Sequence, residues 1–133
     1  MITVIKSPFV QYKLTILRNK KTSNTVFRQT MNEISYLIAS DVLQYVPFKK
    51  QSIQTPLKKM SGTVLGQPII LVPILRAGLG LLEGFAKFLP EAEKGHIGLY
   101  RDEQTYEPVE YLFKLPRVKN KKVLILDPML ATG

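Results

Sequence analysis

Two continuous aliphatic runs constrain the fold of this chain more than any other feature. They occupy residues 68–75 (PIILVPIL) and residues 123–126 (VLIL). Unbroken apolar runs of this kind are typical of strands covered on both faces, as in a parallel sheet. In open α/β sheets, ligands bind beyond the carboxyl ends of such strands. The residues that follow the two runs are therefore the first candidates for a binding site.

The second run leads into Asp127-Pro128 and then into Ala131-Thr132-Gly133. A carboxylate can accept hydrogen bonds from sugar hydroxyls, and the backbone of a Thr-Gly loop can donate N–H groups to a phosphate. Taken alone, an acid followed by proline favours an ordinary strand-ending turn.

The first run ends in a loop of similar character, residues 76–80 (RAGLG). Gly78 and Gly80 allow backbone N–H groups to approach an anion closely. Arg76 adds a planar, permanently charged group that suits a pyrophosphate. Taken singly, Arg76 is also compatible with a surface arginine, and the glycines with a simple change from strand to helix.

Three motifs carry a resemblance to a known family: residues 73–80 (PILRAGLG), 98–103 (GLYRDE) and 126–133 (LDPMLATG). They resemble uracil phosphoribosyltransferases, in that family's order and at compatible spacing. The similarity includes residues 13–20 and 25–31. Most phosphoribosyltransferases of this fold carry two adjacent acids before the Ala-Thr-Gly loop, whereas Asp127-Pro128 is similar to the uracil-specific branch.

The resemblance implies transfer of phosphoribose from phosphoribosyl diphosphate (PRPP) to uracil, which yields UMP and diphosphate. It implies catalytic roles for Arg76, Arg101 and Asp127. Arg76 and the backbone of residues 77–80 would hold the pyrophosphate, Arg101 would close over it, and Asp127 would fix the ribose hydroxyls. The expected PRPP-binding residues are Arg76, Ala77, Gly78, Arg101, Asp127, Pro128, Met129, Leu130, Ala131, Thr132 and Gly133.

The resemblance also implies the cofactor and the partners. Mg²⁺ would arrive bound to the diphosphate of PRPP, so we expect no protein ligand for it. GTP is an expected allosteric activator, and the full-length enzyme is expected to form a homodimer or a higher homo-oligomer.

Family members continue beyond the Ala-Thr-Gly sequence with residues that complete the phosphate loop, and then with a Gly-Asp-rich motif that recognises uracil. The resemblance therefore implies that this chain is an N-terminal portion of the enzyme, without a uracil site of its own. We expect it to form no UMP by itself. We also expect apolar surface on its final strand to be uncovered.

The expected fold class is α/β, a type I phosphoribosyltransferase (Rossmann-like) parallel sheet with helices on both faces. One partial domain is expected, with a helical part over about residues 1–50 and a PRPP-binding core over 60–133. Ser7-Pro8 predicts a helix start, and apolar residues at helical spacing predict helices over residues 27–42 and 81–89. One or two short strands are expected within residues 51–66. Strands over 96–100 and 109–115 should form a projecting hairpin.

Composition narrows the class of protein. The 133 residues contain no cysteine, which excludes disulfides and thiolate metal sites, and a cytoplasmic protein with no membrane partner is expected. His96 is the only histidine, so a hydrolytic triad is unsupported.

The net charge is +9, and residues 1–60 hold ten Lys and Arg residues against Glu33 and Asp41. The lysines form scattered pairs without interleaved aromatics, so solvated turns are favoured over a nucleic-acid surface. A non-catalytic nucleotide- or RNA-binding regulator on the same scaffold stays an alternative, as does specificity for another base.

Overall fold

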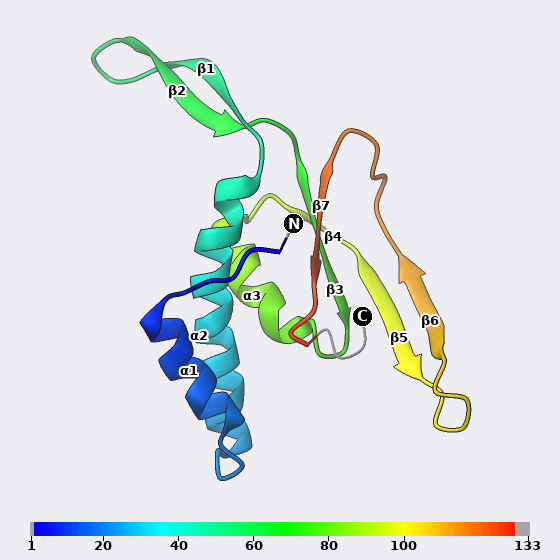
Figure 1. Ribbon diagram of the computed structural model, residues 1–133. Coiled ribbons are helices and arrows are strands. Elements are labelled where there is room, and N and C mark those ends of the chain that lie inside the picture. Colours follow the sequence, from blue (N-terminus) through cyan, green and yellow to red (C-terminus); the bar gives the residue numbers. More distant parts are fainter. Residues whose placement is uncertain (1, 130–133) are drawn as a thin grey trace.

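The computed structural model describes residues 2–129 of the chain. Figure 1 shows helices gathered on one side of a sheet, and a two-stranded hairpin that stands apart from both. The elements in chain order are α1 (Pro8–Arg18), α2 (Asn24–Val42), the 3-10 helix η1 (Leu43–Tyr45), β1 (Phe48–Gln54), β2 (Lys59–Leu65), β3 (Ile69–Leu75), α3 (Leu79–Phe88), β4 (Glu93–Lys94), β5 (His96–Arg101), β6 (Pro108–Lys114) and β7 (Lys122–Leu126).

Serine caps set the starts of both N-terminal helices. Ser7 Oγ accepts the N–H of Val10 at 3.5 Å, and Pro8 fills the first helical position of α1. Proline suits that position because its missing N–H would have no partner within the helix. Ser23 Oγ accepts the N–H of Val26 at 3.4 Å and caps α2. The predicted helix over residues 27–42 is confirmed by α2.

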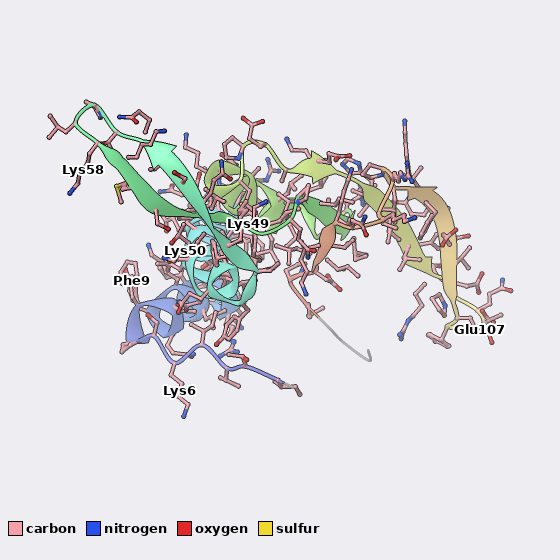
Figure 2. All side chains as sticks on the ribbon, turned by 90° about the horizontal axis from the view of Figure 1, so that it is seen from above. Lys6, Phe9, Lys49, Lys50, Lys58 and Glu107 are labelled. Atoms are coloured by element: carbon pink, nitrogen blue, oxygen red, sulfur yellow. The ribbon has the colours of Figure 1, made fainter. Side chains whose placement is uncertain are left out.

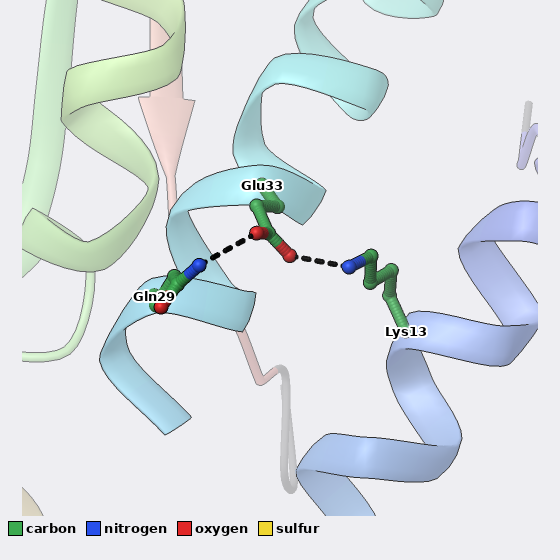
Figure 3. Close-up of polar contacts among 3 residues, drawn as sticks. All are labelled: Lys13, Gln29 and Glu33. Carbon is green, nitrogen blue, oxygen red and sulfur yellow. Dashed lines mark hydrogen bonds and ion pairs between the residues drawn. The ribbon is translucent and has the colours of Figure 1, made fainter. Parts of the chain in front are cut away.

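An ion pair joins α1 to α2 (Figure 3). Nζ of Lys13 lies 2.6 Å from Oε2 of Glu33, and Nε2 of Gln29 donates to Oε1 of the same carboxylate at 3.1 Å. The hydrogen bond from Lys13, followed by that from Gln29, lowers the pKa of Glu33. Both side chains are partly buried, and this contact links the two helices.

The hairpin of β1 and β2 projects from the rest of the chain. Its strands pair in register from Phe48–Leu65 to Gln54–Lys59, and β1 is exposed along its whole length. Figure 2 shows Lys49 and Lys50 along this hairpin and Lys58 near its tip. The strands expected within residues 51–66 are confirmed, and the first begins earlier, at Phe48. The lysines lie in solvent, as the scattered charge pattern indicated.

β3 is the central strand of the sheet. β7 pairs with it in parallel, from Ile69–Lys122 to Pro73–Leu126. β4 and then β5 pair in parallel with the opposite edge of β3 in one continuous register, so together they act as one interrupted strand. β6 pairs antiparallel with β5 and completes the order β7–β3–β4/β5–β6. β4 was not predicted because a two-residue strand is too short to produce a pattern.

The main core lies between the sheet and the helices. Leu71 of β3 and Leu126 of β7 pack with Leu81 and Phe85 of α3, and Ala39 of α2 joins the same cluster. Phe85 is 2% exposed. α3 packs on the sheet, α2 on α3, and α1 on α2. The α/β class with a mixed parallel sheet flanked by helices is therefore confirmed.

One expectation about the layers differs from the structure. Within residues 2–129, all three α-helices lie in series on the same side of the sheet, and not on both faces. Ile70 and Val72 alternate with the core residues of β3 and are fully buried without a helix over them, whereas Ile125 is 63% exposed. A continuous apolar run predicts that both faces of a strand are covered, but it does not tell which element covers them.

The hairpin of β5 and β6 is confirmed, and its turn projects beyond the sheet (Figure 1). Among the described residues, no helix combines the length and the apolar character that crossing a membrane requires.

Candidate functional site at the carboxyl ends of three strands

The three predicted catalytic residues lie at the ends of three neighbouring strands. Asp127 directly follows β7, Arg76 directly follows β3, and Arg101 is the last residue of β5. These strands are parallel and adjacent in the order β7–β3–β5, so their carboxyl ends share one edge of the sheet. All three side chains are exposed to solvent. The topology therefore brings together two guanidinium groups and one carboxylate from distant parts of the sequence.

Close packing at Gly78 joins the first two of these strand ends. A β-carbon on Gly78 would collide with the carbonyl oxygen of Leu126, and it would lie 2.6 and 2.7 Å from the backbone N and O of Ile74. Only glycine fits such an approach of backbone to backbone. The turn after β3 is thus pressed against the last residue of β7. The Leu75–Arg76 peptide bond within this segment is cis.

Most backbone donors of the turn are engaged within the turn itself. The N–H of Gly78 donates to Ile74 O at 2.7 Å, that of Leu79 to Arg76 O at 3.2 Å, and that of Gly80 to Ala77 O at 3.1 Å. Among the described residues, the N–H of Ala77 donates to no backbone carbonyl. Of the N–H groups of residues 77–80, that of Ala77 is therefore the one that we expect to donate to an anion. The later N–H groups are used because α3 begins immediately after the turn.

A cavity of about 870 Å³ connects the two predicted binding segments. Ala77 and Gly80 of the turn and Pro128 and Met129 after β7 all line it. The remaining lining residues come from the helices, and half of them are apolar and half polar or charged: Leu14, Leu17, Phe27, Met31 and Leu79, with Arg18, Arg28, Gln29, Asn32 and Glu83.

Asn32 in this cavity was not among the predicted site residues. Its Nδ2 donates to Oε2 of Glu83 at 2.6 Å, while its Oδ1 is buried with no hydrogen-bond partner among the described residues. A buried acceptor without a partner is uncommon and calls for a donor from water or a ligand. The sequence offers little indication of this role for Asn32. It stands next to Met31, which lies on the apolar face of the predicted helix, and a polar residue at the edge of such a face is common.

The turn that follows Arg101 is organised by Asp102. Oδ1 of Asp102 accepts the N–H groups of Gln104 and Thr105, each at 2.8 Å. These bonds, with that of Thr105 first, lower the pKa of Asp102. The N–H of Asp102 also donates to Glu107 O at 3.0 Å, which closes the turn. Figure 2 places Glu107 at the far end of the molecule from the β1–β2 hairpin.

Four of the expected PRPP-binding residues, Leu130, Ala131, Thr132 and Gly133, lie outside the described residues. Within residues 2–129, no three His, Cys, Asp or Glu side chains gather into a group that could hold a metal ion.

Comparison with known proteins decides the family. The profile of the family named uracil phosphoribosyltransferase matches residues 4–133. The chain belongs to this family. Relatives named uracil phosphoribosyltransferase from Lactiplantibacillus plantarum and Streptococcus thermophilus are each 47% identical to it over 132 residues, which is 98% of this chain and 63% of each relative. The Finegoldia magna relative of the same name is 47% identical over 134 residues. The chain thus spans about 63% of the length of the L. plantarum and S. thermophilus relatives.

A solved structure supports the same family fold. The structure of the AQ2163 protein from Aquifex aeolicus superposes with a TM-score of 0.90 at 35% sequence identity. The match covers 99% of this chain and 64% of that one. The order of strands and helices described above is therefore shared with a solved protein.

Proposed function

We propose that this chain provides the PRPP-binding part of a uracil phosphoribosyltransferase, a pentosyltransferase that converts uracil and PRPP into UMP and diphosphate. The observation that supports the proposal is the position of Arg76, Arg101 and Asp127 at the carboxyl ends of three adjacent parallel strands. Ligands of open α/β sheets bind at such an edge. The PRPP-binding core would span about residues 60–133.

The pyrophosphate of PRPP would lie at the turn after β3. Arg76 would donate charge-assisted hydrogen bonds to it, and the N–H of Ala77 would add one from the backbone. Arg101 would approach from the end of β5. In the transfer step the bond between ribose C1 and the diphosphate oxygen breaks and its electrons leave with the diphosphate, while positive charge develops on the ribose. N1 of uracil forms the new bond to C1, and the proton that N1 carried passes to the diphosphate or to solvent. Fixed positive groups around the departing diphosphate lower the barrier by stabilising its charge.

Asp127 would accept hydrogen bonds from the ribose hydroxyls and so orient the sugar. Pro128 and Met129 would continue this binding segment, followed by residues 130–133 at the 5′-phosphate. The proximity of Leu126 to Gly78 supports this arrangement, because it brings the ribose segment within one strand spacing of the pyrophosphate turn.

Mg²⁺ would enter with the diphosphate and would neutralise part of its charge when bound. Mg²⁺ commonly keeps water ligands and uses substrate phosphates rather than a protein cage, so the exposed carboxylate of Asp127 need only accept from hydroxyls. A homo-oligomer and activation by GTP are part of the proposal on the strength of family membership alone.

The experiment is calorimetric titration of the purified chain with Mg²⁺–PRPP and with Mg²⁺–pyrophosphate. We expect Arg76→Gln to weaken both ligands by roughly 10- to 100-fold, since hydrogen bonds to charged groups contribute about 1.5–3 kcal/mol each. Asp127→Asn should weaken PRPP alone, because pyrophosphate has no ribose. Arg117→Gln is the matched control, because Arg117 is also exposed but lies ahead of β7, at the opposite end of the strand from Asp127.

Unaltered affinity of Arg76→Gln for both ligands would contradict the proposed pyrophosphate site. If Asp127→Asn lost affinity for PRPP and for pyrophosphate equally, the ribose assignment would be contradicted. The assignment of the pyrophosphate to the turn after β3 would still stand. Formation of UMP from radiolabelled uracil, measured in parallel, tests the complete reaction.

A further inference from the structure

Two tyrosines on the β5–β6 hairpin are not used by the proposed reaction. Tyr100 of β5 and Tyr111 of β6 are each 53% exposed, and their ring centroids lie 6.2 Å apart with the planes tilted by 40°. Pairs with this geometry are favourable and restrain each ring. Such a pair on a solvent-facing surface presents two phenol hydroxyls in a limited range of positions.

The ring of Tyr111 lies across strand β5. The register of the hairpin shifts between Gly98 and Leu99, so that Tyr111 is the extra residue on β6. A β-carbon on Gly98 would lie 2.5 Å from Cζ and 2.6 Å from Cε2 of Tyr111. The ring therefore occupies the space that a side chain at residue 98 would need. Bulges of this kind redirect single side chains and are frequent beside active sites.

This position brings the phenol toward the turn after β3. Gly98 pairs with Leu75, the residue directly before Arg76. Since β5 lies between β6 and β3, a ring that starts on β6 and crosses Gly98 reaches toward the carboxyl end of β3. Because Cζ carries the hydroxyl, the hydroxyl is the part of the side chain that extends furthest in this direction.

We propose that Tyr111 is a further substrate-binding residue, whose O–H donates a hydrogen bond to a diphosphate oxygen held at the Arg76 turn. The inference rests on the proposed function, because the diphosphate is the ligand expected there. A phenol gives one directed donor without adding charge, and its ring is held in place by Gly98 below and Tyr100 beside it. A hydrogen bond from a neutral donor to an anionic oxygen is stronger than one between two neutral groups.

The test is Tyr111→Phe, which removes the hydroxyl and keeps the ring over Gly98. Titration with Mg²⁺–pyrophosphate and Mg²⁺–PRPP should show about tenfold weaker binding of both ligands, the usual effect of one hydrogen bond to a charged acceptor. The thermal unfolding midpoint should stay unchanged. Tyr45→Phe is the matched control, since Tyr45 is 68% exposed on η1 and lies on no strand of the site.

A second variant tests the position of the ring. In Gly98→Ala the new methyl group displaces Tyr111, so we expect the same tenfold loss of affinity for both ligands. The double variant, Gly98→Ala with Tyr111→Phe, should bind them no more weakly than either single variant. Additive losses in the double variant would overturn the proposal, because the two changes would then act separately.

The outcomes separate this inference from the proposed function. If the unsubstituted chain binds pyrophosphate and Tyr111→Phe binds it equally well, the role of Tyr111 is refuted and the proposed function stands. If the folded, unsubstituted chain binds neither ligand, both are refuted.

Discussion

Replacing Gly78 with alanine tests the junction on which the candidate site depends. The backbone of Gly78 has φ −60° and ψ −19°, which alanine adopts without strain. Any loss of stability must therefore come from lack of space. The methyl group would collide with the carbonyl of Leu126 and lie 2.6 and 2.7 Å from backbone atoms of Ile74, so β3 and β7 would have to move apart.

The expected magnitude follows from two opposing effects. Overpacking in a well-packed region costs about 1–3 kcal/mol, and the upper end applies because all three obstructing atoms belong to backbone. Gly→Ala also reduces the conformational entropy of the unfolded chain, which raises the free energy of unfolding by roughly 0.4–1 kcal/mol. We expect Gly78→Ala to reduce the free energy of unfolding by about 2 kcal/mol.

Urea denaturation of the chain, followed by circular dichroism, measures this change. Gly80→Ala is the matched control. Its methyl group would meet only the side chain of Met31, with Cγ at 2.9 Å and Sδ at 3.9 Å, and that flexible side chain can move. Alanine is also the better helix former, by about 1 kcal/mol, and Gly80 lies within α3. Equal stabilities of Gly78→Ala and Gly80→Ala would refute the reasoning, because the two glycines would then be under the same constraint.

Three further changes have definite expected outcomes. Phe85→Ala should lower the free energy of unfolding by about 3–5 kcal/mol in the same urea titration, because Phe85 is 2% exposed in the main core. Ser23→Ala should cost about 1 kcal/mol through loss of the α2 cap, and Ser23→Asp should restore it. The pKa of Asp102 is lowered from its ordinary value of 3.8, so its stabilisation of the hairpin turn is present above that pH and is lost as the pH falls through the lower, folded-state pKa. NMR titration of the Gln104 and Thr105 amides should show this midpoint below 3.8, and Asp102→Asn should abolish the transition.

The helices and main strands follow from local signals in the sequence. Ser7-Pro8 and Ser23 define helix starts because capping depends on residues only three positions apart. Pro90 follows α3 closely because proline cannot continue a helix. The runs in β3 and β7 are recognisable because buried strands need continuous apolar side chains.

The placement of Arg76, Arg101 and Asp127 at one edge follows from equally general rules. Once three strands are parallel neighbours, their carboxyl ends must share an edge. The sequence therefore predicted which residues would lie at this edge of the sheet, although their chemical roles stay predictions.

Contacts between distant segments were decided only by the tertiary structure. Nothing local indicates that the ring of Tyr111 crosses Gly98, that Asn32 reaches Glu83, or that all described helices stack on one side of the sheet. The apolar composition of a run predicts that it is buried, but it does not tell which other element covers it. Sequence alone determined the caps, the strands and the residues at their ends, because those depend on neighbours along the chain. The close contact of Gly78 with β7, the engaged N–H groups of the turn and the cavity beside them depend on how separate segments pack, and only the folded chain fixes that.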